Sequence, residues 1–150
     1  MSAAAGILHP RSGNARPGRR AVRCQPGRER GVLVPYDPTN VFARILRDEL
    51  PSERVYEDDQ FVAFRDAAPQ APTHIVLIPR GEAPASPADL READATWIGR
   101  MMVLAARIAT DVGLAAEGYR LVINCGTHGG QTVPHLHLHI LGGRQLGRLG

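Results

Sequence analysis

Three histidines alternate with apolar residues near the C-terminal end of the chain, and this alternation constrains the fold more than any other feature. The segment reads His-Leu-His-Leu-His-Ile over residues 135–140. Successive side chains of a β-strand point to opposite faces, so the three histidines share one face, and Leu136, Leu138 and Ile140 point into a core. Three imidazoles on one face are costly to bury without partners. The pattern therefore predicts a strand with a core face and a functional face.

Two kinds of chemistry suit such a face. Three imidazoles can ligate zinc, and a neutral imidazole can also act as a nucleophile. The preceding segment, residues 124–132, reads Asn-Cys-Gly-Thr-His-Gly-Gly-Gln-Thr. Its three glycines allow a loop that turns backbone N–H groups toward an anion. A phosphate site needs such a loop and a metal site does not, so the combination favours nucleophilic attack at phosphate and leaves zinc as an alternative.

The rest of the chain predicts an α+β fold. Thr39 or Asn40 can cap a short helix that Pro51 ends. The apolar run His74–Pro79 predicts a strand buried on both faces. Apolar residues at three- and four-residue steps predict one long helix, which Gly113 ends. The expected elements are a helix from residue 39, strands at 53–57, 61–66 and 74–79, a helix at 88–112, and strands at 119–124 and 133–141. This order predicts a five-stranded, mostly antiparallel meander sheet with one long and one short helix.

The charge is unevenly distributed along the chain. Residues 1–30 hold seven arginines and one acid, whereas residues 31–150 hold eleven arginines and fourteen acids. We therefore expect a disordered basic N-terminal extension at 1–35 and a mildly acidic folded domain at 36–150. Because the folded part lacks a broad basic face, we expect no nucleic-acid partner. No apolar run is long enough to cross a bilayer, so no membrane partner is expected either.

The N-terminal extension leaves its own alternatives open. An arginine-rich, acid-poor segment can be a mitochondrial transit peptide, but the four prolines from Pro10 to Pro35 disfavour the amphipathic helix that such a peptide needs. A flexible tail, or a translation start placed too far upstream, fits better. The two cysteines, Cys24 and Cys125, do not make a disulfide framework. A reducing compartment, and hence a cytoplasmic location, is expected.

Residues 129–144, Gly-Gly-Gln-Thr-Val-Pro-His-Leu-His-Leu-His-Ile-Leu-Gly-Gly-Arg, resemble the signature of the histidine triad (HIT) family. They are similar in particular to its Hint branch, the purine nucleoside phosphoramidases. The blocks at 66–79, 40–46 and 57–59 match further family blocks, so the resemblance covers roughly residues 38–146. It implies a HIT-like fold and a homodimer, in which the long helix and a strand join two sheets into one of ten strands.

The resemblance also implies catalytic roles. His137 takes the position of the nucleophile that attacks the α-phosphorus, and the backbone carbonyl of His135 orients its ring. His139 corresponds to the residue that hydrogen-bonds the phosphate oxygens. His74 resembles a further active-site histidine, and Thr132 corresponds to a residue that helps to protonate the leaving group.

The same resemblance implies the substrate contacts of a purine nucleotide such as AMP. The two oxygens of Asp66 suit the two ribose hydroxyls. The phosphate contacts are Asn124, Gly130, Gln131, Thr132 and His139, and the apolar base pocket consists of Phe42, Ile45, Phe64 and Val76. No metal or other cofactor is implied, with zinc kept as a minor alternative.

The implied reaction is hydrolysis of purine nucleoside 5′-phosphoramidates, such as adenosine 5′-monophosphoramidate, or of aminoacyl adenylates, through a nucleotidyl-histidine. The alternatives are a dinucleoside polyphosphate hydrolase, as in the Fhit branch, a non-catalytic purine nucleotide-binding module, and a zinc protein. Two departures from the family pattern bear on this choice. The segment 79–82 lacks a common histidine, and the ending 145–150 lacks the usual Trp-Pro-Pro-Gly, which leaves the leaving-group preference open.

Overall fold

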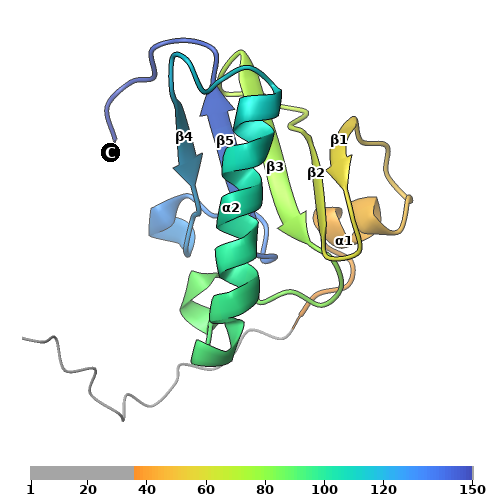
Figure 1. The fold of residues 1–150 in the computed structure, drawn as a ribbon. Helices are drawn as coiled ribbons and strands as arrows, with labels where there is room; N and C mark the ends of the chain where they lie inside the picture. The colour runs from red at the N-terminus through yellow and green to blue at the C-terminus, as the bar shows by residue number, and fades with distance from the viewer. Residues whose placement is uncertain (1–35, 150) are drawn as a thin grey trace, which may run out of the picture. The chain divides into compact units, whose positions relative to one another are not determined.

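The computed structural model describes residues 36–149, and a five-stranded antiparallel sheet forms its centre (Figure 1). The strands are β1 (Arg54–Glu57), β2 (Phe61–Arg65), β3 (Thr73–Pro79), β4 (Tyr119–Val122) and β5 (Leu138–Gly142). Their order, β1-β2-β3-β5-β4, follows a meander up to β3 and then places β5 between β3 and β4. The predicted α+β fold is confirmed, while the predictions for the N-terminal extension lie outside the described residues.

The short helix α1 (Val41–Leu46) covers part of one face of this sheet. Asn40 caps it, because its side-chain oxygen accepts a hydrogen bond from the N–H of Ala43 at 2.9 Å. Phe42 and Ile45 are buried against strands β2 and β3, whereas Val41 is exposed. The helix therefore contributes an aromatic and an aliphatic side chain to this face.

The alternation along β3 divides the core into two layers. Ile75 and Leu77 pack with the long helix α2 (Ala95–Asp111), and Val76 and Ile78 pack on the other face with α1. Strand β5 follows the same rule, since Leu138 and Ile140 belong to the α2 layer. The side chain of His139 consequently lies on the face opposite α2, which is the face that α1 partly covers.

The long helix begins later than predicted, at Ala95 instead of residue 88. Two 3-10 turns, Pro87–Asp89 and Glu92–Asp94, precede it. The carboxylate of Asp89 accepts a hydrogen bond from the N–H of Ser86 at 3.0 Å, and the extended backbone of Leu90 then breaks the helical path. Across residues 36–149, no helix combines the length and the apolar character that a bilayer crossing requires.

The last strand also begins later than predicted, at Leu138 instead of residue 133. Pro134 has no N–H, and the N–H of Leu136 donates to the carbonyl of Pro84 at 2.8 Å instead of to a strand. The alternation persists through this segment, because Leu136 is fully buried in the α2 layer. His135 and His137 therefore precede the strand.

Candidate active site

The sheet face opposite α2 brings four of the predicted histidines together. The ring of His137 makes edge contacts with Phe42 and His139, at centroid distances of 4.9 and 4.8 Å. The rings of His139 and His74 are 5.0 Å apart, and His135 lies 5.9 Å from Phe42. His74, His135 and His137 are buried, and His139 is half-buried. The predicted histidine-lined face therefore exists, on elements far apart in the sequence.

His135 is the most enclosed of these residues, with 0% of its surface exposed. Its Nε2 donates to the carbonyl of Pro79 at 3.3 Å, and its Nδ1 lies 3.3 Å from the hydroxyl of Tyr36. Burial lowers the pKa of His135 to about 4, against the opposing hydrogen bond to Pro79. The ring is therefore neutral at pH 7, and both of its nitrogens have partners inside the protein.

His137 is oriented through its own chain. Its Nδ1 donates to the carbonyl oxygen of His135 at 2.7 Å, so the neutral ring has its free lone pair on Nε2. Burial lowers the pKa of His137, and the hydrogen bond to His135 and the charge of Asp66 oppose that effect. Nε2 makes no hydrogen bond to residues 36–149. An unprotonated, unpartnered nitrogen beside a second imidazole is a suitable nucleophile.

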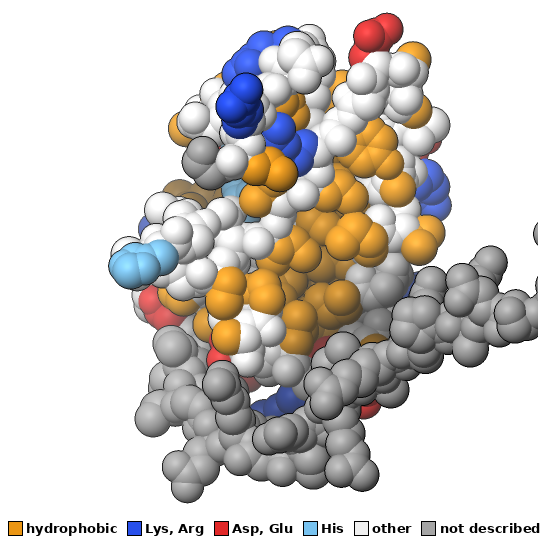
Figure 2. Space-filling view, turned by 90° about the vertical axis from the view of Figure 1, so that its left-hand side faces the viewer, with side chains coloured by type: hydrophobic (Ala, Val, Ile, Leu, Met, Phe, Trp, Pro, Cys, Tyr) orange, Lys and Arg blue, Asp and Glu red, His pale blue; other side chains and the backbone are white. Residues whose placement is uncertain are grey.

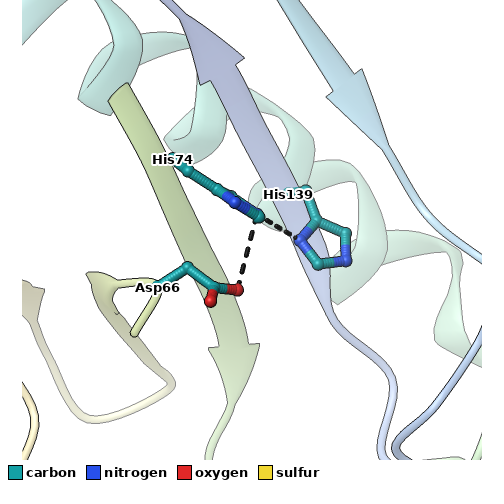
Figure 3. Close-up of side chains that lie close together, drawn as sticks. All are labelled: Asp66, His74 and His139. Carbon is teal, nitrogen blue, oxygen red and sulfur yellow. Dashed lines mark hydrogen bonds and ion pairs between the residues drawn. The ribbon is translucent and has the colours of Figure 1, made fainter. Parts of the chain in front are cut away.

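His139, His74 and Asp66 form a connected group (Figure 3). Nε2 of His74 lies 2.8 Å from Nδ1 of His139 and 3.5 Å from Oδ2 of Asp66. The backbone N–H of Gln70 donates to Nδ1 of His74 at 3.1 Å. Burial, followed by repulsion from His137 and His74, lowers the pKa of His139 to about 4. All of these rings are therefore favoured in the neutral form.

The glycine-rich loop between β4 and β5 is braced by two amide side chains. Oε1 of Gln131 accepts from the N–H of Gly126 at 3.0 Å, and its Nε2 donates to the carbonyl of Ala85 at 2.6 Å. The side-chain nitrogen of Asn124 donates to the carbonyl of Gly129. Gly126 and Gly130 have φ angles of +66° and +76°, which side chains other than glycine rarely allow. The sequence of this loop thus fixes its shape.

The backbone donors of the loop are partly used within it. The N–H groups of Gly129 and Gln131 donate to the carbonyl of Gly126, and that of Gly130 donates to Thr127. An anion bound by these three N–H groups would require the turns to open. Thr132 is exposed, and its hydroxyl makes no hydrogen bond to the described residues. Of the predicted phosphate contacts in the loop, Thr132 has a free hydroxyl, and Asn124 retains the second N–H of its side-chain amide.

The predicted base-pocket residues lie together beside the histidines. Phe42, Ile45, Phe64 and Val76 belong to one buried cluster, which also contains Val62 and Ile78. The ring of Phe42 bridges this cluster and His137. An apolar surface therefore borders the candidate nucleophile.

The three triad histidines do not form a common ligand set for a metal. Both ring nitrogens of His135 have partners within the protein, and Nδ1 of His137 donates to a carbonyl. A different set, Asp66, His74 and His139, has its potential ligand atoms within 4.8 Å of one another. In the described part of the chain, these side chains come close enough together to share a metal ion.

Acid should destabilise the fold through its buried histidines. Unfolded histidine has a pKa of about 6.5, and the pKa values of His135 and His139 fall to about 4 in the folded protein. The unfolded chain therefore binds protons first, so stability that is present above about pH 6.5 is lost as the pH falls toward about 4. We expect the urea midpoint to decrease between about pH 7 and pH 4.5. An unchanged midpoint over this range would contradict these histidine environments.

Comparison with known proteins gives a consistent family assignment. The profile of the family described as HIT domain matches residues 47–146. The purine nucleoside phosphoramidase of Escherichia coli (strain K12) is 50% identical over 107 residues, which cover 71% of this chain and 89% of that protein. A HIT family hydrolase from Legionella pneumophila superposes with a TM-score of 0.67 at 43% identity, covering 70% of this chain and 93% of that one.

A zinc-bound relative is also among the similar structures. The histidine triad family protein from Mycobacterium smegmatis, crystallised with zinc, superposes with a TM-score of 0.60 at 28% identity. The match covers 71% of this chain and 76% of that one.

Proposed function

The chain belongs to the HIT domain family, and we propose on that premise that it is a purine nucleoside 5′-phosphoramidase. Nε2 of His137 attacks the α-phosphorus of a substrate such as adenosine 5′-monophosphoramidate, and the P–N bond breaks as the nitrogen leaves with a proton. Water then cleaves the nucleotidyl-histidine and releases AMP. The observation that carries the proposal is the hydrogen bond from Nδ1 of His137 to the carbonyl of His135, which leaves Nε2 unprotonated.

The remaining site residues have complementary tasks in this proposal. The side chain of His139 donates a hydrogen bond to a phosphate oxygen as negative charge develops there. The hydroxyl of Thr132 helps to protonate the leaving nitrogen. Asp66 accepts hydrogen bonds from the ribose hydroxyls. The apolar cluster around Phe42 contacts the purine. No metal takes part, since the nucleophile is an imidazole and the phosphate charge is met by hydrogen-bond donors.

A comparison of two substrates tests the proposal against its nearest rivals. Adenosine 5′-monophosphoramidate should be hydrolysed with a higher kcat/KM than diadenosine polyphosphates. Faster cleavage of the dinucleotide would instead favour a dinucleoside polyphosphate hydrolase. Tight AMP binding without turnover of either substrate would favour a nucleotide-binding module.

We also propose that two copies pair through α2 and β4. Strand β4 is an edge strand with β5 as its one neighbour in the described sheet. Figure 2, which faces the side where β4 lies in Figure 1, shows hydrophobic side chains gathered over a wide area. Along and just after β4, Tyr119, Leu121 and Ile123 remain partly exposed. Pairing of two β4 edges would cover this area and continue the sheet across the two-fold axis.

Two neighbouring apolar residues of α2 offer a matched test. Arg100 and Arg107 lie on the flank of α2 that borders Tyr56 of β1. Because successive helical residues are rotated by about 100°, Met102, which is 42% exposed, lies on the opposite flank. Val103, which is 73% exposed, lies on the same flank as Arg100 and Arg107, near β1. Met102→Glu should raise the dimer dissociation constant by about tenfold or more, because it buries a charge in an apolar interface. Val103→Glu should leave it unchanged, as sedimentation equilibrium would show. Equal effects would contradict the proposed interface.

A further inference from the structure

One backbone N–H determines where the proton of His74 lies. Nδ1 of His74 accepts a hydrogen bond from the N–H of Gln70 at 3.1 Å. A ring nitrogen that accepts carries no proton, so neutral His74 carries its proton on Nε2. The residue is buried, which disfavours exchange of this arrangement with solvent. Oδ2 of Asp66, 3.5 Å from Nε2, favours the same tautomer because a carboxylate attracts the N–H.

The proton on His74 in turn determines the tautomer of His139. Nε2–H of His74 donates to Nδ1 of His139 at 2.8 Å. Nδ1 of His139 is therefore the acceptor, and the proton of that ring lies on Nε2. In Figure 3 the second nitrogen of His139 points away from His74. Two successive hydrogen bonds, from Gln70 to His74 and from His74 to His139, thus place the ring proton of His139 on Nε2.

Gln70 is itself held by a residue that follows β5, at the end of the sheet where Thr73 of β3 pairs with Gly142. It lies in the loop between β2 and β3, and the guanidinium of Arg144 donates to its carbonyl oxygen at 3.1 Å. Arg144 closely follows β5, the strand that carries His139. Within the loop, the N–H of Ala68 donates to Asp66 at 2.8 Å. The contact with Arg144 therefore connects Gln70, whose N–H orients His74, to the segment that follows the His139 strand.

We infer that Gln70 and Arg144 are positioning residues, which direct the proton of His139 to Nε2 so that it faces the substrate phosphate. The inference rests on the proposed function for its catalytic meaning. Its structural part is the hydrogen-bond order from Gln70 through His74 to His139. That order supplies a donor where negative charge develops, without any change of protonation during the reaction.

The same order is incompatible with a metal ion at Asp66, His74 and His139. A metal bound to Nε2 of His74 needs a lone pair there, which moves the ring proton to Nδ1. The N–H of Gln70 would then face a second N–H at 3.1 Å instead of an acceptor. The hydrogen bonds from Nε2–H of His74 to His139 and toward Asp66 therefore explain why these three side chains lie so close together, and this set of atoms does not fit zinc.

Nuclear magnetic resonance of the imidazole nitrogens tests the structural part. In the wild type, both His74 and His139 should give the ¹⁵N shifts of the Nε2–H tautomer, and equimolar zinc should leave them unchanged. Gln70→Pro removes the N–H and should give His74 a mixture of tautomers, whereas Gln70→Ala retains it and should preserve the wild-type shifts. An Nδ1–H tautomer in wild-type His74, or zinc-induced shifts of its Nε2, would overturn the inference.

Kinetics of Arg144 variants test the catalytic part. Arg144→Ala should lower kcat on adenosine 5′-monophosphoramidate by about threefold to tenfold with little change in KM, as expected for one surface hydrogen bond. Arg144→Lys, which can still donate, should recover most of this loss. Arg120→Ala is the control, since Arg120 makes the same kind of contact to the carbonyl of Gly147 and no hydrogen bond to Gln70 or His74. Equal losses in both alanine variants would overturn the role of Arg144. If the wild type itself shows no turnover, the proposed function fails, and the nitrogen shifts alone decide the inference.

Discussion

Replacement of His137 by alanine is expected to lower kcat for adenosine 5′-monophosphoramidate by at least about 10⁴-fold, because no other group can form the covalent intermediate. Among residues 36–149, the only other imidazole whose ring contacts that of His137 belongs to His139, and its Nδ1 is engaged with His74. The affinity for AMP should stay within about tenfold, since one neutral hydrogen bond contributes roughly 0.5–1.5 kcal/mol.

Steady-state kinetics and calorimetric titration with AMP measure both quantities for the His137 variant. The fold should be retained, because the ring packs against Phe42 and His139 at the edge of the core. Turnover within about tenfold of the wild type would show that His137 is not the nucleophile. If the affinity for AMP fell by as large a factor as kcat, His137 would be a binding residue instead of the nucleophile.

Replacement of His139 by alanine is expected to lower kcat by about 10²- to 10³-fold, the loss typical of removing one donor to a developing oxyanion. KM should change little, because the donor acts mainly on the transition state. The side chain is half-buried, so the substitution also leaves a small cavity, and the urea midpoint must be measured alongside. A raised KM with an unchanged kcat would contradict this role and make His139 a ground-state contact.

The period-two alternation of histidine and apolar residues was sufficient to predict that the histidines share one face and the apolar residues enter the core on the other. It divides residues 135–140 between the α2 core and the opposite face, and the structure has Leu136, Leu138 and Ile140 fully buried in that core. The apolar run of β3 was likewise predicted to be buried on both faces, and its side chains enter both layers. These patterns are local, so a single sequence reveals them.

The starts of α2 and β5 were predicted less well, because at both places other hydrogen bonds replace those of the helix or the strand. The local composition gives no sign of them. The segment from Ser86 to Asp89 has a capping pattern that closes a short turn, but its sequence, Ser-Pro-Ala-Asp, also suits the start of a longer helix. The last strand was predicted to start at residue 133, yet the hydrogen bond from Leu136 to the carbonyl of Pro84 moves that start to Leu138. That hydrogen bond joins segments far apart in the sequence.

Several residues that shape the site had no role predicted from the sequence, although Gln70 and Arg144 lie within the blocks that resemble the HIT family. Tyr36 reaches His135 through its hydroxyl, and Arg144 reaches the carbonyl of Gln70 across 74 positions of the chain. The contribution of Gln70 is a backbone N–H, which every residue except proline possesses. Such contacts depend on tertiary geometry and not on residue type, so only the structure reveals them.

Intact-protein mass spectrometry after brief mixing with an adenosine phosphoramidate at low pH tests the central claim most directly. The wild type should gain the mass of one AMP moiety, and His137→Ala should not. That pair of results would establish a nucleotidyl-histidine on His137. Product formation at the wild-type rate by His137→Ala, or an adduct that persists in this variant, would contradict the account.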